Sequence, residues 1–163
     1  MDIIINQIFI IQISIINLEK KINTPYIIEK KYPIYATEFI LKEIDIDKMH
    51  IFNHFDFGSY LEFKGIPAFI DSRSGVFSRE FNDTSILEDW YKSINGETDY
   101  KEIFKKYNIT HALLYKDELI SQYIDDDTNY NMIYEDDYFV LYEKKKNDSI
   151  PLKSIFNQKT QKL

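Results

Sequence analysis

The sequence contains no cysteine. This excludes a disulfide scaffold, a cysteine-ligated zinc finger and a thiol nucleophile, but it leaves the compartment open, because extracytoplasmic domains can also lack disulfides. Glycine is scarce too: only four of the 163 residues are Gly, and none falls in a GxGxxG or P-loop arrangement. No serine lies in a GxSxG nucleophile elbow. The sequence therefore predicts no nucleotide or other cofactor and gives no support to acyl-transfer chemistry.

Basic residues are fewer than acidic ones, and they are unevenly placed. The formal net charge is −7, yet the segment from residue 144 to the end holds six Lys and one acid. An acidic body repels phosphate backbones, so we expect no nucleic-acid partner for the folded part. Residues 144–163 are expected to form a basic, flexible tail, with contact to anionic lipid or RNA as the alternative.

A largely apolar stretch covers residues 3–18, and a charged connector continues to residue 31. As a helix, sixteen residues would span about 24 Å, less than the roughly 30 Å hydrocarbon core of a bilayer. No basic cluster precedes the stretch and no small-residue cleavage site follows it, which argues against a signal peptide. Three interpretations stay open: the end of a transmembrane helix, an amphipathic helix or strand of the domain, or a weak membrane anchor.

Residues 32–143 have the pattern of one α/β domain. Short apolar runs near residues 50, 70, 113, 133 and 140 are typical of strands. Between them the apolar residues follow helical spacing, which predicts helices at 33–47, 59–63, 86–94, 100–107 and 118–124. Strands that alternate with helices indicate a layered sheet covered by helices. We expect the first three strands to be parallel and the last two to form an antiparallel hairpin.

Polar residues indicate where these elements begin and end. Asp99 is expected to cap the helix that follows it, as is Asp117, and one of residues 83–85 should cap the helix at 86–94. The triplet at 56–58 is expected to form a turn in which Gly58 can take a positive φ. The pair at 136–137 is expected to form a tight hairpin turn, although it lacks the favoured Gly.

A group of polar residues follows the first two predicted strands. Side chains at the carboxyl ends of buried strands commonly form the sites of open α/β sheets. Arg73 is one of only two Arg beside 18 Lys, and its planar fork offers a bidentate geometry that Lys lacks. The candidate residues are Asn53, Asp56, Gly58, Tyr60, Asp71 and Arg73. They can form a pocket for a sugar, phosphate or carboxylate group, or a buried ion pair that only stabilises the fold.

Two spacings resemble metal sites, and we predict no metal at either. His50 and His54 are four residues apart, but the segment has the pattern of a strand and a turn, without a HExxH motif or a nearby third ligand. The acidic loop from Asp125 to Asp136 echoes a calcium loop. However, Tyr130 stands where that loop needs Gly, and the twelfth residue is not Glu.

Several motifs occur in a characteristic order. They are a Tyr32-Pro33 helix start, Asn53 at a strand end, and residues 57–61 (FGSYL), 69–73 (FIDSR), 106–109 (KYNI) and 134–141 (YEDDYFVL). In this order they resemble a soluble domain at the C-terminus of bacterial glycosyltransferase C-type membrane proteins, which are relatives of dolichyl-phosphate-mannose-dependent transferases. The resemblance covers roughly residues 32–143. Ser72 departs from the motif, in which Gly is common.

The resemblance implies a domain on the extracytoplasmic face of the cell membrane, beside a membrane-embedded transferase module. In that family the catalytic acids lie in loops between early transmembrane helices, which this sequence does not contain, so no catalytic residue carries over. The implied role is to position a lipid-linked sugar or an acceptor. The alternatives are a structural or protein-interaction domain without a ligand, and a small hydrolase that uses Asp71 or His54 as an acid or base.

Overall fold

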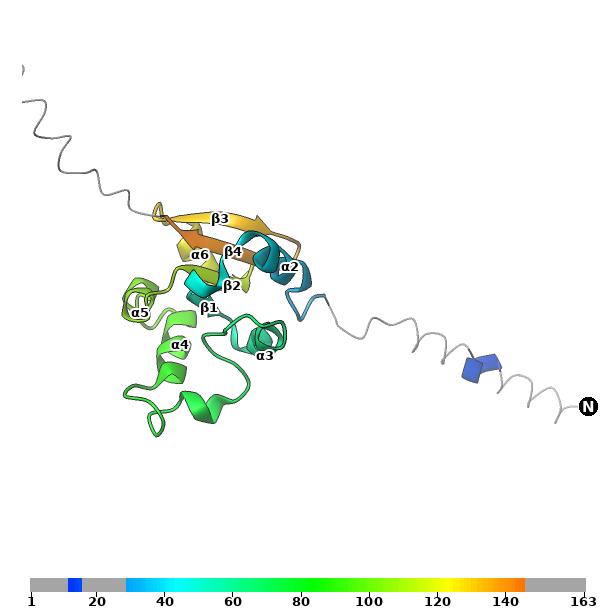
Figure 1. Ribbon diagram of the computed structural model, residues 1–163, viewed down its shortest axis with the longest axis horizontal. Helices are drawn as coiled ribbons and strands as arrows, with labels where there is room; N and C mark the ends of the chain where they lie inside the picture. Colours follow the sequence, from blue (N-terminus) through cyan, green and yellow to red (C-terminus); the bar gives the residue numbers. More distant parts are fainter. Residues whose placement is uncertain (1–11, 16–28, 146–163) are drawn as a thin grey trace, which may run out of the picture.

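The computed structural model describes residues 12–15 and 29–145 (Figure 1). Residues 12–15 are helical, and the rest of the apolar stretch at 3–18 lies outside the described residues. The tail beyond residue 145 lies outside them as well, whereas Lys144 is the last residue of a strand. Within the described ranges, no helix has the length and apolar character needed to cross a membrane.

The domain is built on one four-stranded sheet with the order β1-β2-β4-β3. Its strands are β1 (Ile51–Asn53), β2 (His111–Tyr115), β3 (Tyr130–Glu135) and β4 (Phe139–Lys144). β1 and β2 are parallel, whereas β4 pairs antiparallel with both β2 and β3. The prediction of a mixed α/β fold with a C-terminal hairpin is therefore confirmed.

The prediction of three parallel strands is wrong, because residues 68–71 form no strand. The backbone of this segment bonds to a side chain instead of to a neighbouring strand. The amide of Asn53, at the end of β1, accepts from the Phe69 N–H at 2.8 Å and donates to the Ile70 carbonyl at 2.9 Å. These two bonds satisfy the groups that a strand partner would otherwise engage.

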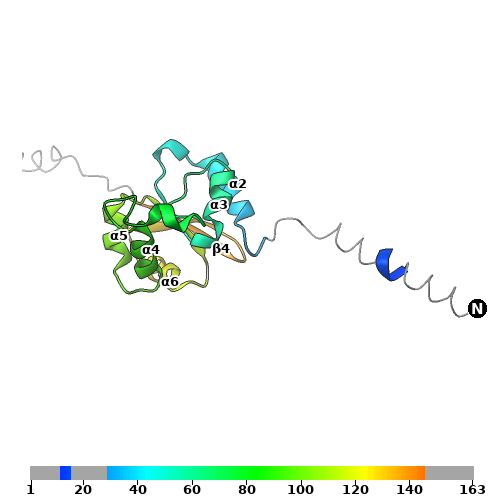
Figure 2. The same ribbon diagram turned by 90° about the horizontal axis from the view of Figure 1, so that it is seen from below.

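Helices cover both faces of the sheet, as Figure 2 shows. One face carries α2 (Ile34–Glu43) and α3 (Phe55–Phe63), and the other carries α4 (Ile86–Ile94), α5 (Tyr100–Lys106) and α6 (Leu119–Asp125). Two short 3₁₀ turns, η1 (Ile46–Lys48) and η2 (Ser74–Phe77), lie in the connections.

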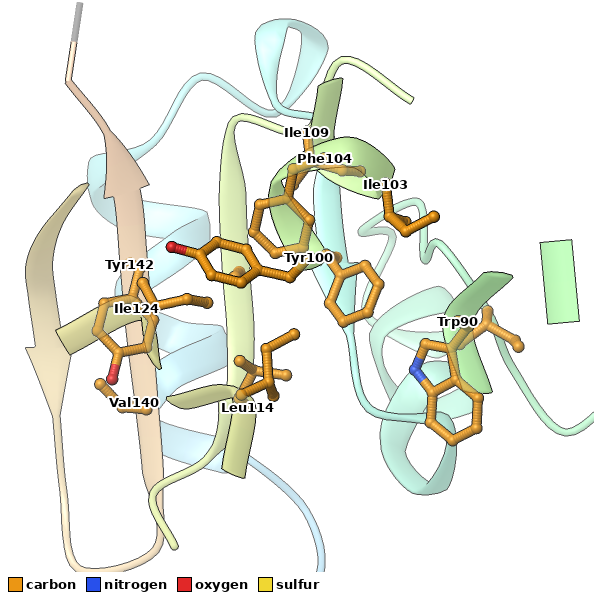
Figure 3. Packing of buried hydrophobic residues seen from close by; sticks show 13 residues of the cluster. Trp90, Tyr100, Ile103, Phe104, Ile109, Leu114, Ile124, Val140 and Tyr142 are labelled. Atoms are coloured by element: carbon orange, nitrogen blue, oxygen red, sulfur yellow. The ribbon is translucent and has the colours of Figure 1, made fainter. Parts of the chain in front are cut away.

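Alternation along the strands divides the core into two layers, because successive side chains of a strand point to opposite faces. Leu113 and Leu141 pack under α2 and α3. Leu114, Val140 and Tyr142 pack under α4, α5 and α6, where Figure 3 shows them beside the aromatic rings of the helices. The second layer also holds Phe52, Trp90, Tyr100, Phe104 and Ile124.

Capping residues explain most helix starts. The Ser85 hydroxyl accepts from the Glu88 N–H at 3.2 Å, and the Asp99 carboxylate accepts from the Lys101 N–H at 2.9 Å, as expected. The expected cap at Asp117 is wrong: Glu118 occupies the N-cap position of α6, without a side-chain capping bond. The expected turn at 56–58 is also wrong, because α3 begins at Phe55 and runs through these residues.

Candidate functional site

Four of the six candidate residues gather around the segment at 68–73. Besides its bonds to Phe69 and Ile70, the Asn53 amide donates to the His54 carbonyl at 2.8 Å. The Asn53 carbonyl in turn accepts from the Trp90 indole N–H at 3.0 Å. Asn53 is fully buried. Its side chain therefore joins the end of β1 to the following segment, and it is not available to a ligand.

Gly58 lies in the middle of α3, directly beneath this segment. Its φ is not positive, contrary to expectation. A Cβ atom at this position would lie 1.9 Å from the Ile70 carbonyl oxygen and 2.9 Å from the Asp71 Cα. Glycine is therefore needed here because another backbone approaches the helix closely, and the backbone conformation is not the reason.

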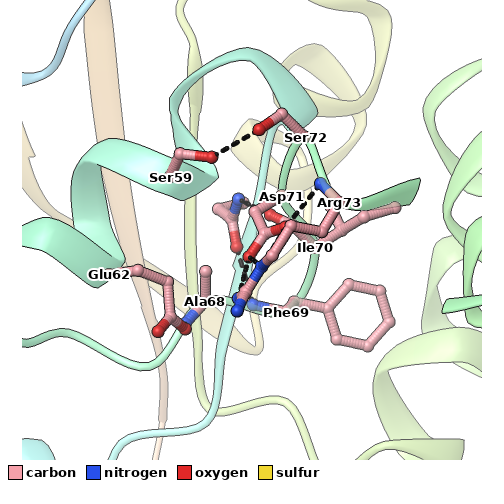
Figure 4. A network of polar contacts seen from close by, with 9 residues as sticks. Ser59, Glu62, Ala68, Phe69, Ile70, Asp71, Ser72 and Arg73 are labelled. Carbon is pink, nitrogen blue, oxygen red and sulfur yellow. Dashed lines mark hydrogen bonds and ion pairs between the residues drawn. The ribbon is translucent and has the colours of Figure 1, made fainter. Parts of the chain in front are cut away.

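Asp71 and Arg73 form the ion pair that the sequence suggested. The Arg73 Nε lies 3.0 Å and 2.9 Å from the two Asp71 carboxylate oxygens, and the Arg73 backbone N–H donates to the same carboxylate at 2.8 Å (Figure 4). The hydrogen bonds from Arg73 lower the pKa of Asp71 below its usual value. The Asp71 side chain is 1% exposed and that of Arg73 is 63% exposed, so only the arginine faces solvent.

The remaining two candidates lie apart from this group. Tyr60 is buried, and its ring centre lies 5.4 Å from that of Tyr32, on the chain that leads into α2. Asp56 is exposed in the first turn of α3 and lines a cleft. The expected single cluster is thus divided between a buried polar group at 53–73 and the edge of a cleft.

The cleft lies at the carboxyl ends of the two parallel strands and has a volume of about 1080 Å³. Its wall is formed by the end of β2, the first turn of α3, the β3–β4 turn and the chain before α2. Three tyrosines, three aspartates and three lysines line it: Tyr32, Tyr115, Tyr138, Asp56, Asp117, Asp137, Lys30, Lys31 and Lys116. This is the position at which open α/β sheets usually bind ligands.

The inner wall of the cleft is electronegative. Burial raises the pKa of the Tyr115 hydroxyl to about 12, with further contributions from the Asp56 and Glu118 carboxyls. Lys116 does not offset these charges freely, because its ammonium pairs with Glu135 on β3. The cleft therefore combines aromatic faces and carboxylates with two exposed lysines, Lys30 and Lys31, near its entrance.

A second pair of polar side chains lies behind this wall. His54 follows β1, and its Nε2 lies 3.3 Å from the Oε1 of Glu118, which follows β2. Burial lowers the pKa of His54 and raises that of Glu118 to about 8; the nearby Asp117 and Asp56 also raise the latter. Burial thus favours the uncharged form of both groups.

This pair was not predicted from the sequence. The sequence does carry one indication of the pair. His54 comes directly after a predicted strand, and Glu118 follows the short turn after another. The carboxyl ends of neighbouring parallel strands meet at one edge of a sheet. Using it would have required knowing that β1 lies next to β2 and not next to residues 68–71. Tyr115 was not singled out from the sequence and Tyr138 was named only within the motif at 134–141, yet both line the cleft.

Neither of the metal-like spacings forms a cluster of ligands. In the parts of the chain that the structure describes, no group of three or more His, Asp or Glu side chains is placed to hold a metal ion. His50 lies before β1 and His54 after it, where His54 caps α3. In the acidic loop, Asp127 is buried and accepts from the Tyr100 hydroxyl at 2.6 Å.

The chain matches no known protein-family model, no curated protein and no solved structure. The resemblance to the glycosyltransferase-associated domain therefore stays a prediction.

Proposed function

We propose that this chain is a non-catalytic carbohydrate-binding domain that acts beside a membrane glycosyltransferase module, on the outer face of the cell membrane. In this proposal the cleft holds the sugar of a lipid-linked donor, or the acceptor, in position for the transferase. The observation that carries it is the cleft itself: three tyrosines and three aspartates gathered at the carboxyl ends of β1 and β2.

The chemistry of the lining suits a sugar ring. A sugar presents a C–H face that packs on aromatic rings and hydroxyl groups that donate to carboxylates. Tyr138, at the tip of the β3–β4 hairpin, is exposed and adjoins Asp137. Lys30 and Lys31 lie where the phosphate of a lipid carrier can approach from solvent.

A positioning role fits the lining better than catalysis does. Among the described residues that line the cleft, none is histidine or glutamate. Asp71, one of the two acids or bases considered for a hydrolase, is buried and bonded to Arg73. His54, the other, faces Glu118 behind the wall. The buried polar group at 53–73, which includes Asp71, is proposed to stabilise only the segment in which it lies.

Binding is tested by saturation-transfer NMR with mannobiose and diacetylchitobiose. We expect signal transfer to at least one of them, and about a fivefold loss of affinity in Tyr138→Ala, since one ring contact contributes about 1 kcal/mol. Tyr91→Ala is the matched control, because Tyr91 is also exposed but lies on α4, outside the cleft. If neither sugar binds, or both variants bind equally, the cleft is not a carbohydrate site.

The membrane location is tested separately by liposome flotation. The full chain is compared with a chain that starts at residue 29, where the described domain begins. We expect only the full chain to float with the liposomes. If neither chain floats while circular dichroism shows both to be folded, the membrane part of the proposal is wrong, and carbohydrate binding is judged on the NMR result alone.

A further inference from the structure

We propose that His54 and Glu118 form a proton-dependent clasp that holds the two loops behind the cleft together and opens when the pair loses a proton. The clasp concerns the same cleft, but it does not depend on the ligand being a sugar. It is a conformational device of the fold, and it rests on four features of the pair: its position, its tautomer, its burial and the charges around it.

The position of the pair makes it a connection between two loops. His54 joins β1 to α3, and Glu118 joins β2 to α6. Because β1 and β2 are parallel neighbours, both loops emerge at the same edge of the sheet. The contact of 3.3 Å between Nε2 of His54 and Oε1 of Glu118 therefore bridges segments that are far apart in the chain.

The tautomer of His54 is set by the start of α3. Its Nδ1 accepts from the Asp56 backbone N–H at 3.1 Å, so this nitrogen carries no proton in the neutral ring. The proton of the neutral imidazole then lies on Nε2, which faces Glu118. A second proton on Nδ1 would break the cap of α3. The Asp56 carboxylate lies 3.7 Å from Nδ1 and favours the charged ring, but burial outweighs it and keeps the pKa of His54 below its usual value.

The pair is enclosed by aromatic side chains. The ring centre of His54 lies 5.0 Å from that of Tyr115, 5.5 Å from that of Trp90 and 5.9 Å from that of Phe57. The side chains of His54 and Glu118 are only 18% and 15% exposed. The second carboxyl oxygen of Glu118 is buried and has no hydrogen-bond partner among the described residues. A charge on this carboxyl would be poorly solvated.

The charged groups around Glu118 also oppose its ionisation. Asp56 faces it from α3 and Asp117 from the turn before α6, and both act to raise its pKa. Tyr115 faces the site from β2 with a raised pKa of its own, and α4 contributes the uncharged Trp90. Lys116 is engaged by Glu135. Ionised Glu118 thus adds a further negative charge beside two others. None of the described residues that shift its pKa is a cation, and a hydrogen bond with the Tyr115 backbone, which lowers this pKa, is outweighed by burial and the two carboxylates.

Loss of the proton should separate the loops. The Nε2–H of His54 would donate more strongly to an ionised carboxyl, but this single bond does not replace the water lost by burial beside Asp56 and Asp117. An ionised Glu118 therefore gains solvation by moving out of the aromatic enclosure, which breaks its contact with His54. Asp56, Tyr115 and Asp117 lie on the same two loops and line the cleft. The clasp is therefore closed while Glu118 holds its proton and open once the proton is lost, and the cleft has a different shape in the two states.

Trp90 provides a ligand-free test, because it is the only tryptophan and its ring lies against His54. We expect its fluorescence to change between pH 6 and 9 with a midpoint of about 8, set by Glu118. Glu118→Gln should abolish this transition, whereas Glu102→Gln, an exposed position on α5, should keep it. Far-UV circular dichroism should stay constant over the range, which separates opening from unfolding.

Two results would overturn the clasp: a wild-type protein without a transition between pH 7 and 9, or a Glu118→Gln variant with the same midpoint. If that variant does not fold, carbon-13 NMR of the glutamate carboxyls in the wild-type protein replaces it. One carboxyl should then titrate near pH 8, and titration of all of them near pH 4.5 would contradict the proposal. Since no sugar is used, these outcomes leave the carbohydrate proposal to its own test.

Discussion

Single residues of this domain act through backbone groups that lie far away in the sequence. The Asn53 amide takes the place of a strand partner for residues 68–71, and Gly58 lets the same segment lie on α3. Both residues were singled out from the sequence as site candidates. Their contacts show that they hold residues 68–71 in place on α3. The Asn53 bonds matter because an unpaired backbone group in this buried region would cost free energy of folding.

Gly58→Ala tests the close approach. The added methyl group would meet the Ile70 carbonyl, so either α3 or the segment must shift. We expect a loss of about 2–3 kcal/mol in the free energy of unfolding, despite the better helix propensity of Ala. Gly75→Ala is the control, since nothing lies within 4 Å of its added Cβ, and it should change stability by less than about 0.5 kcal/mol. Equal effects in urea denaturation would contradict the packing argument.

Asp71→Asn tests the ion pair with Arg73. Asn can still accept from the Arg73 backbone N–H, but it loses the charge that holds the guanidinium. Because Arg73 is largely exposed, we expect a cost of only about 1 kcal/mol at pH 7. The folded-state pKa of Asp71 is lowered, so this stabilisation is present above about pH 4 and is lost as the pH falls through the folded-state pKa. A cost that persists at pH 2 would point to packing instead of charge.

At the scale of elements, the β3–β4 hairpin shows how a turn forms without glycine. The Asp136 carboxylate accepts from the backbone N–H groups of Tyr138 and Phe139, each at 2.8 Å, and from the Tyr134 hydroxyl at the same distance. These bonds close the turn, as an Asx turn does. The turn also places Asp137 and Tyr138 at the cleft, so it links the fold to the proposed site.

Asp136→Ala should weaken the hairpin. Two backbone N–H groups lose their acceptor, which we expect to cost about 1–2 kcal/mol of unfolding free energy. Asp126→Ala, at an exposed position after α6, should cost much less. Thermal unfolding followed by circular dichroism measures both variants. If the two melting temperatures fall by the same amount, the side-chain bonds of Asp136 are not what stabilises the turn.

For the whole molecule, burial of Glu118 makes stability depend on pH. Its pKa is raised from 4.5 to about 8 on folding, so the folded state keeps a proton that the unfolded state releases. The protonated group is therefore most favourable to folding below about pH 4.5, and this contribution is lost as the pH rises through 8. In Glu118→Gln, which keeps the shape of the neutral acid, this part of the pH dependence should be absent.

The measurement is urea denaturation of both proteins at pH 5 and pH 8.5. We expect Glu118→Gln to gain about 2–4 kcal/mol relative to the wild-type protein between the two pH values. Other titrating groups are common to both proteins and cancel in the comparison. A difference that does not change with pH would show that Glu118 ionises normally in the folded state.

The sequence by itself determined part of the local structure. Helical spacing after a cap at one of residues 83–85 predicted α4 with the bounds that the structure has, and an apolar run near residue 113 predicted β2. The closing hairpin was also expected. These features depend on side-chain periodicity, capping and turn chemistry, which act over a few residues and can be read directly from the chain.

Only the tertiary structure decided which of these elements meet. Pairing of β1 with β2 brings His54 and Glu118 within 3.3 Å, although 64 positions separate them in the sequence. Because β1 pairs with β2, the backbone of residues 68–71 bonds to the Asn53 side chain and not to a strand. The need for glycine at position 58 arises from a backbone twelve residues further along the chain. Contacts and pKa shifts of this kind depend on burial and on neighbours from other elements, and no local pattern in the sequence specifies them.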